Sequence, residues 1–323
     1  MKKSLAMLWA VVALFGLLAT GCNKGTNGPD DENAPAGVNN EQSARVYFAN
    51  NDEFVNNDEK TIDDQDIQPT DYAIGFGKVE ATITPLRWGR FVTRVVRTVT
   101  DTVMPGDTIA FVHVHKDIQG VLRILALNAN GDTVRINKDF NDKSNRNIIF
   151  KRVGREPRRF WLNWVPVATS LVAGGTVAPN NNINLTKIEF ITRNDTITIT
   201  DPLRFYLRYR WLRLYNQGNK DVPEVDAGAN VLLKATVVSS SPDTDLVALR
   251  FGFGPFHKRR VRMHIVSEQQ IGSNYERVFQ IVFPMHFHRG FFHAAVDAAT
   301  KATLFDDQAP YSVSWWGVPY RVL

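Results

Sequence analysis

Alternating runs of β-branched residues constrain the fold of this chain more than any other feature. The run RFVTRVVRTVTDTV at residues 90–103 is dense in Val and Thr and is too polar for a buried helix. Similar runs recur from Tyr72 onward, and Gly, Pro, Asn and Asp separate them as in hairpin turns. No long stretch shows the apolar period of an amphipathic helix. The sequence therefore predicts an all-β fold.

A polar segment divides the strand-rich part in two. Residues 217–227 combine polar side chains with Pro223, which is typical of a linker. We expect an N-terminal β domain at residues 45–216 and a C-terminal β domain at residues 228–323, both sandwich-like. The second resembles an immunoglobulin-like sandwich in size and strand number only, because the cysteine pair of true immunoglobulin domains is absent.

The first 22 residues have the pattern of an export signal. A positively charged start precedes an apolar run at residues 5–18, which is shorter than the roughly 20 residues of a transmembrane helix. The sequence LATGC at residues 18–22 follows at once, and it resembles the signal of bacterial lipoproteins. Ala19 departs from the Leu that this family favours at that position. The match covers only this short region of the chain.

The resemblance implies that residues 1–21 are a signal peptide and that Cys22 carries acyl chains. Cys22 is the only cysteine in the chain, and an ordinary cleaved signal with a chance cysteine is the alternative. The expected partner is the membrane, and the covalent lipid takes the place of any cofactor. Asn23, where an Asp retains lipoproteins in the inner membrane, favours the outer membrane. Acidic residues 30–32 are similar to a surface-export signal.

Residues 22–44 are expected to form a disordered tether, because they are rich in Gly, Pro, Asn and acidic residues. Residues 30–68 contain eleven acidic and two basic residues, so a strongly acidic leader precedes a basic body. Its repeated NNDE motif suggests a calcium loop, but the mid-loop Gly and terminal Glu of an EF-hand are missing. A solvated acidic loop is the simpler interpretation.

Two His-x-His pairs are candidate metal ligands. His113 and His115 lie in FVHVH, and His286 and His288 lie in PMHFH. On a strand, residues i and i+2 share a face about 7 Å apart, so each pair could chelate a metal with a third ligand from a neighbouring strand. Histidines on a strand surface without a metal are the alternative.

Arginines and tryptophans are candidate ligand-binding residues. Arg204, Arg208 and Arg210 alternate with aromatic residues in LRFYLRYRWLRLY, and Trp315 and Trp316 lie near the C-terminus. Arg beside aromatic rings suits anionic glycans or phosphates. Consecutive residues on a strand face opposite ways, so at least one of the two tryptophans is expected in the core.

Further basic residues cluster at three other places in the chain. They are candidates for the same anion binding, and the alternative for all of them is that they cover solvent-facing strand surfaces. The clusters are Arg87, Arg90, Arg94 and Arg97; Arg155, Arg158 and Arg159; and Lys258, Arg259, Arg260 and Arg262.

The sequence favours a noncatalytic function in the cell envelope. It contains no Gly-x-Ser-x-Gly, His-Glu-x-x-His or P-loop motif, and export argues against nucleic acid as a partner. We expect a structural or binding module that contacts an envelope protein or an anionic glycan. A metal-binding or glycan-degrading exported β protein is the alternative.

Overall fold

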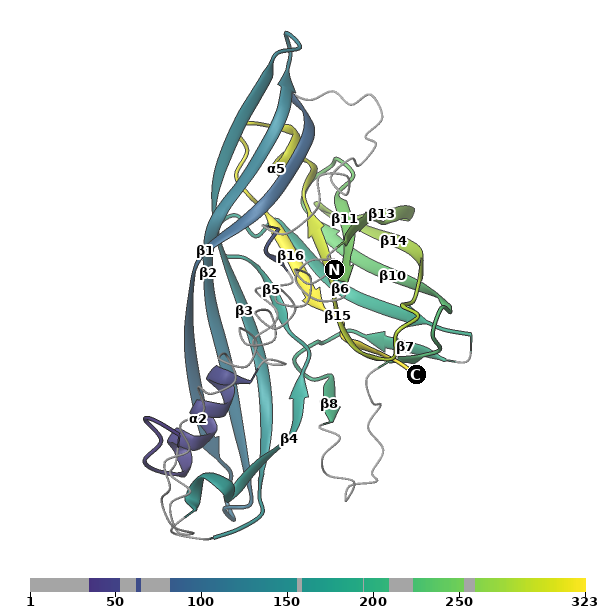
Figure 1. Ribbon diagram of the computed structural model, residues 1–323. Helices are drawn as coiled ribbons and strands as arrows, with labels where there is room; N and C mark the ends of the chain where they lie inside the picture. Colours follow the sequence, from purple (N-terminus) through teal and green to yellow (C-terminus); the bar gives the residue numbers. More distant parts are fainter. Residues whose placement is uncertain are drawn as a thin grey trace, which may run out of the picture. The chain divides into compact units, whose positions relative to one another are not determined.

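The computed structural model describes residues 35–52, 62–64, 82–155, 159–193, 195–208, 223–252 and 259–323 (Figure 1). The chain divides into a unit of residues 1–37 and a compact unit of residues 38–323, and the description below concerns the second. The predicted signal peptide and Cys22 lie outside the described residues. The part of the chain that is described contains no helix with the length and apolar character that crossing a bilayer requires.

The larger of two sheets contains twelve strands. Its main path runs β1 (Ile83–Val103), β2 (Ile109–Asn128), β3 (Thr133–Arg152), β5 (Ala173–Thr176), β16 (Val313–Gly317), β15 (Gly290–Ala299), β11 (Leu246–Gly252), β12 (Arg259–Arg262). Four short strands pair beside this path: β4 (Trp164–Ser170), β8 (Tyr206–Arg208), β9 (Glu224–Val225), β17 (Tyr320–Val322).

The strands β1, β2 and β3 are 20 or 21 residues long and pair along almost their whole length. The turns between them contain Gly106 and Gly131, both with positive φ, which glycine adopts without the steric cost that a side chain brings. Side chains of β2 alternate between buried and more exposed positions from Ile109 onward. Side chains of β3 alternate in the same way. This alternation means that β2 and β3 bury one face and leave the other face open.

The smaller sheet has five strands in the order β13 (His264–Ile271), β14 (Asn274–Pro284), β10 (Asn230–Ser239), β6 (Ile183–Ile191), β7 (Thr196–Ile199). Side chains from this sheet and from β11, β15, β16 and β17 form one hydrophobic cluster, which includes Phe190, Leu233, Val296 and Trp316. The two sheets therefore pack face to face. The predicted all-β class and sandwich-like arrangement are confirmed.

The strands on the two sides of the predicted linker pair with one another. β6, before the linker, pairs along β10, after it, and β5 pairs with β16 in the same way. The hydrophobic cluster between the sheets likewise contains residues from both sides, such as Leu185 and Val237. The segment 217–227 therefore does not separate two independent cores, and residues 38–323 form one compact unit.

Besides the strands, the described residues form two helices and one 3-10 turn. The helix α2 (Glu41–Asn51) begins at Asn40, whose side chain accepts a hydrogen bond from the Ser43 backbone N–H. Because α2 starts at Glu41, the last four residues of the predicted tether are helical, which corrects that boundary. The others are η2 (Phe160–Leu162) and α5 (Lys301–Phe305).

The buried face of the long strands carries two hydrophobic clusters. Towards the β1–β2 turn, α2 covers it, and Phe48 packs edge-on against Phe150 with ring centroids 5.5 Å apart. Towards the β2–β3 turn, α5 and β16 cover it, and Trp315 lies in this second cluster with no exposed surface. The ring of Trp315 lies against Gly174, where a side chain would collide with it.

Candidate functional site

The first predicted metal pair is held by hydrogen bonds. His113 and His115 lie on the open face of β2, half-buried. His113 Nδ1 lies 2.8 Å from Asn147 Oδ1, and His115 Nδ1 lies 2.9 Å from Asn145 Oδ1. A carboxamide oxygen accepts from a ring N–H, so these contacts fix the rings as parts of a polar ladder between β2 and β3.

The second predicted pair does not share a strand face. His286 and His288 lie in the loop between β14 and β15, and His286 stacks on Phe292 with centroids 4.2 Å apart. The premise of i and i+2 strand geometry is therefore wrong here. Within the described ranges, no group of three or more His, Cys, Asp or Glu residues could hold a metal ion.

The predicted tryptophan platform is also corrected. Trp315 is fully buried and Trp316 is 5% exposed, and the two rings enter hydrophobic clusters on opposite sides of β16. The expectation that at least one of them lies in the core is confirmed, and it holds for both. Neither ring can serve as a surface platform for a ligand.

The predicted arginine set is only partly described. Arg204 is highly exposed and lies 3.4 Å from Asp201, whereas Arg208 is half-buried on β8. Arg210 lies outside the described residues, as do all residues from 209 to 222. Among the described residues, Arg204 and Arg208 cannot share a surface platform with Trp315 and Trp316, because both rings are buried.

A buried ion cluster joins the long strands to the sandwich. Asp64 accepts hydrogen bonds from Arg250 Nη1, from Arg250 Nη2 at 3.2 Å and from the Arg90 backbone N–H at 2.8 Å. Asp297 accepts from Arg90 Nη2 and from Arg250 Nε, both at 2.9 Å. Arg260 lies 3.4 Å from Asp64. These side chains are at most 4% exposed, so the cluster is part of the core.

The pKa values of two buried carboxyl groups in this region shift in opposite directions. Burial raises the pKa of Asp64, but the guanidinium groups of Arg250, Arg260 and Arg90 outweigh it and bring the pKa down to about 2. Burial raises the pKa of Asp142, which accepts from the Tyr311 hydroxyl at 3.1 Å, to about 6. Arg90 and Arg260, predicted as surface cations, thus belong to the core.

A shallow groove of about 260 Å³ lies between β1, β2 and β3, near the β2–β3 turn. We call it the arginine groove, and its charged lining residues are Arg87, Arg123 and Arg135. All three side chains are exposed. Arg87 and Arg135 flank Leu125 in one cross-strand row, and Arg123 lies opposite Gly89 and Asn137 in the next row. Directly opposed residues point to the same face, so the three guanidinium groups share the open face.

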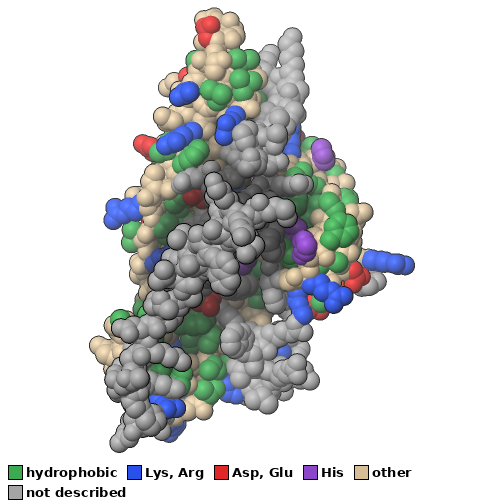
Figure 2. Space-filling model, in the orientation of Figure 1, with side chains coloured by type: hydrophobic (Ala, Val, Ile, Leu, Met, Phe, Trp, Pro, Cys, Tyr) green, Lys and Arg blue, Asp and Glu red, His purple; other side chains and the backbone are tan. Residues whose placement is uncertain are grey.

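All charged side chains among the described residues that line the arginine groove are positive. The described residues that line it include no acidic side chain. The guanidinium carbon of Arg123 lies 4.3 Å from the centre of the Phe91 ring, which holds one face of that group by a cation–π contact. Figure 2 shows Lys and Arg side chains on the part of the surface that the long strands form. The groove can bind a planar or tetrahedral anion through bidentate contacts.

A larger cleft of about 660 Å³ lies next to the arginine groove along β3. It lies beside the part of β3 that precedes the residues paired with β5. Polar side chains dominate its lining and include Gln119, Asp139, Asn141 and Asp307. A hydrogen bond from Gln308 lowers the pKa of Asp307. The lining thus combines amides and carboxylates, which are hydrogen-bonding partners for sugar hydroxyls.

Lys138 also lines this cleft, but its ammonium group points into the protein. Nζ donates to the carbonyl oxygens of Thr303 at 2.9 Å and Ala309 at 2.7 Å, where it closes the end of α5 and the following loop. Burial lowers its pKa to about 8. Lys138 therefore has a structural role at the rim of the cleft.

Sequence reasoning placed Arg87 in a basic cluster but did not single out Arg123 or Arg135. The signal that could have found them is the strand register, which brings residues 87, 123 and 135 together although they are far apart in the chain. The turns at Gly106 and Gly131 determine this register, so counting residues back from them along the strands would place these arginines near one another.

Comparison with known proteins gives no family. No protein-family model matches the chain, and no curated protein matches it. A solved multidomain structure of Extended-Synaptotagmin 2 aligns at 8% identity over 87% of this chain and 97% of that chain. Its TM-score is 0.13, which carries no argument about fold or function.

Proposed function

We propose that this protein is a noncatalytic, lipid-anchored module of a bacterial cell envelope that binds an anionic glycan on the open face of its long strands. The observation that carries the proposal is the arginine groove, with Arg87, Arg123 and Arg135 on three adjacent strands. The anchor at Cys22 is supported by the export signal and by the absence of any other cysteine in the sequence.

The arginine groove is suited to binding because its three arginines belong to paired strands. Side chains on paired strands are placed more accurately than side chains on loops. Arg123 is further oriented by the Phe91 ring, at 4.3 Å. A guanidinium group that is already oriented loses less entropy when it binds a carboxylate, sulfate or phosphate.

A glycan is favoured over a free small anion by the neighbouring cleft. Asn137 lines the arginine groove, and Asp139 and Asn141 line the cleft, so both hollows follow one another along β3. A chain of sugars can place an acidic group among the arginines and its hydroxyls against the amides. Nucleic acid is disfavoured because an exported protein does not meet it as a regular partner.

The cleft favours binding over glycan cleavage. A glycosidase needs a general acid whose pKa is raised, paired with a second carboxylate. Asp139 and Asp307 both line the cleft, but the pKa of Asp307 is lowered, mainly by a hydrogen bond from Gln308. This shift is opposite to the one that protonates a leaving group.

The experiment measures binding of defined glycans to the acylated protein in detergent. The probes are a sulfated heparin oligosaccharide, an oligogalacturonate and neutral dextran, with mass spectrometry to verify the acyl chains on Cys22. We expect the two anionic probes to bind and dextran not to bind. The double variant Arg123→Gln/Arg135→Gln should raise the dissociation constant at least about tenfold, since the loss of even one charge-assisted hydrogen bond costs roughly 1.5–3 kcal/mol.

The matched control is Arg193→Gln/Arg289→Gln, which removes the same charge from two exposed positions outside the groove. It should leave affinity within about twofold. An equal loss in both double variants would mean that net charge and not the groove binds the probe, and would refute the site. Absence of binding to either anionic probe would refute the proposed function.

A further inference from the structure

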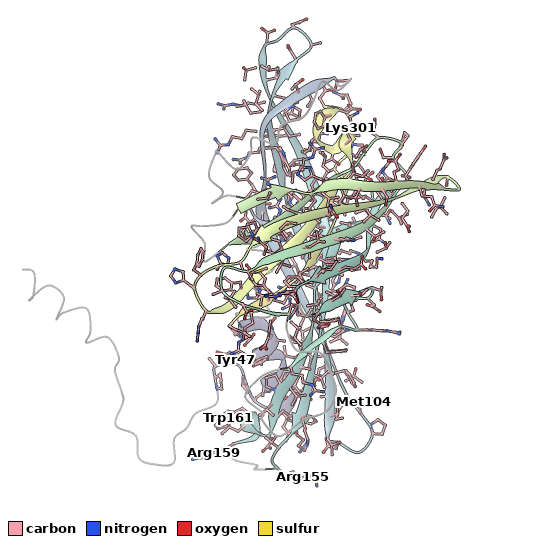
Figure 3. All side chains as sticks on the ribbon, turned by 90° about the vertical axis from the view of Figure 1, so that its right-hand side faces the viewer. Tyr47, Met104, Arg155, Arg159, Trp161 and Lys301 are labelled. Carbon is pink, nitrogen blue, oxygen red and sulfur yellow. The ribbon has the colours of Figure 1, made fainter. Side chains whose placement is uncertain are left out.

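Apolar side chains are exposed together at the end of the long strands where β1 turns into β2. The largest are Tyr47, Val103, Met104, Ile109, Phe111, Val153, Leu162, with exposed fractions between 38% and 54%. In Figure 3, Tyr47, Met104 and Trp161 lie at one end of the strands and Lys301 lies towards the other. We call this set of residues the apolar tip. A soluble surface seldom exposes so many large apolar groups in one place without a binding role.

The apolar tip is the shared end of the long strands. The Met104 backbone N–H donates to the Ile109 carbonyl at 2.9 Å, which closes the β1–β2 turn, and Ile109 and Phe111 lie on the same face of β2. Val103 lies opposite Ala110 and so points to the other face. The Val153 backbone N–H donates to the Asn163 carbonyl at 2.7 Å, which joins the end of β3 to η2. The apolar tip is therefore the common end of β1, β2, β3, η2 and α2, with exposed apolar side chains on both faces of the strands.

Cations lie beside the apolar tip. The described basic residues on either side of Val153 are Lys151, Arg152, Arg155 and Arg159. Arg155 and Arg159 are exposed, and Figure 3 shows both at the same end of the strands as Trp161. Aromatic and aliphatic groups among Arg side chains form the pattern of a surface that enters the headgroup region of an anionic bilayer.

The chain enters its folded unit at this same end. Glu41, the first residue of α2, accepts hydrogen bonds from Arg152, Asn163 and Trp164. Arg152 also pairs with Asp107 in the β1–β2 turn at 3.0 Å. The start of α2 is thus fastened to the apolar tip.

We propose that the apolar tip rests on the anionic lipid surface into which Cys22 is anchored. Asn40 comes only 18 positions after Cys22, a separation of at most about 63 Å when fully extended and about 25 Å on average for a coil. A short tether raises the effective concentration of lipid at the apolar tip, so weak interfacial contacts suffice. This inference rests on the lipid anchor of the proposed function, but not on glycan binding.

The test places a fluorescent label at the apolar tip of the acylated protein in vesicles of phosphatidylethanolamine and phosphatidylglycerol. Cys22 is blocked by lipid, so Leu162→Cys provides a single thiol. Asn130→Cys provides the matched control, since it is exposed in the turn at the opposite end of β2. We expect lipids with headgroup spin labels to quench the Leu162→Cys label at least threefold more than the Asn130→Cys label. Equal quenching at the two positions would overturn the inference.

The charge variant Arg155→Glu/Arg159→Glu tests the choice of partner, with Arg193→Glu/Arg289→Glu as its equal-charge control. We expect quenching at Leu162→Cys to fall by half or more in the first variant only, and to fall likewise in vesicles of phosphatidylcholine alone. Unchanged quenching in both cases would overturn an anionic lipid surface as the partner. A chain without acyl groups by mass spectrometry, labelled also at Cys22, would instead refute the anchor in the proposed function.

Discussion

Replacement of Asp64 by Asn is the most informative test of the buried ion cluster. The change keeps the size of the side chain but removes the charge that faces Arg250 and Arg260. Asp64 is fully buried, so water cannot replace the lost carboxylate. Two guanidinium groups that share this carboxylate then lose their nearest counter-charge in the core.

The size of the effect can be worked out in two ways. Removal of one partner from a buried ion pair costs about 3–5 kcal/mol, because the other charge stays buried and uncompensated. The pKa of Asp64 falls from 3.8 to about 2 in the folded protein, which corresponds to about 2–3 kcal/mol in favour of the ionised form. We therefore expect Asp64→Asn to lower the free energy of unfolding by about 3 kcal/mol at pH 7.

The assay is equilibrium unfolding in urea, followed by the fluorescence of the buried tryptophans. With a slope of about 3 kcal/mol per molar urea for a unit of this size, the midpoint should fall by about 1 M. The control is Asp243→Asn, which makes the same chemical change in an exposed pair with Lys301 at 2.9 Å. It should change stability by less than about 1 kcal/mol.

A second variant separates the ion cluster from simple loss of packing. In the Asp64→Asn background, Arg90, Arg250 and Arg260 are left with Asp297 as the one carboxylate of the cluster. Arg250→Met then removes one excess positive charge, while Arg90 still pairs with Asp297 at 2.9 Å. Part of the lost stability should then return. A loss below about 1 kcal/mol for Asp64→Asn, or no recovery in the double variant, would show that the cluster does not contribute in this way.

Two further predictions concern the same core. Burial, aided by the charge of Asp297, raises the pKa of Asp142 to about 6, so below pH 6 the folded state binds a proton that the unfolded state lacks until about pH 3.8. The wild type should therefore gain about 1 kcal/mol relative to Asp142→Asn between pH 7 and pH 5 in urea unfolding, and parallel pH profiles would contradict this. Gly174→Ala would drive a Cβ into the ring of Trp315. It should cost about 1–3 kcal/mol in the same assay, and an unchanged midpoint would show that the strand moves aside freely.

Local patterns in the sequence were sufficient to predict the all-β class. The alternation in β2 and the turns at Gly106 and Gly131 follow from side-chain period and backbone conformation, which are local properties. The helix α2 was missed because its sequence has little apolar periodicity. It is held by the Asn40 cap and by the contacts of Glu41, the second of which depends on residues more than a hundred positions away.

The sites depend on pairings that a single sequence does not show. Charged residues are seldom fully buried, so Arg90 was expected at the surface and Arg250 was not singled out. Their shared partner Asp297 lies 207 residues from Arg90 and 47 residues from Arg250. The arginine groove has the same origin, because only the register of three strands brings Arg123 and Arg135 together.

The length of the three long strands has a mechanical consequence. Ile109 lies at the apolar tip, and Leu125 lies beside the arginine groove on the same strand. Roughly sixteen residues of strand span about 50 Å, and the strands on either side brace that span along its length. In the proposed arrangement the hairpins would act as a spacer, and the number of residues in a strand, more than the length of the tether, would set the distance between the bilayer and the proposed glycan site.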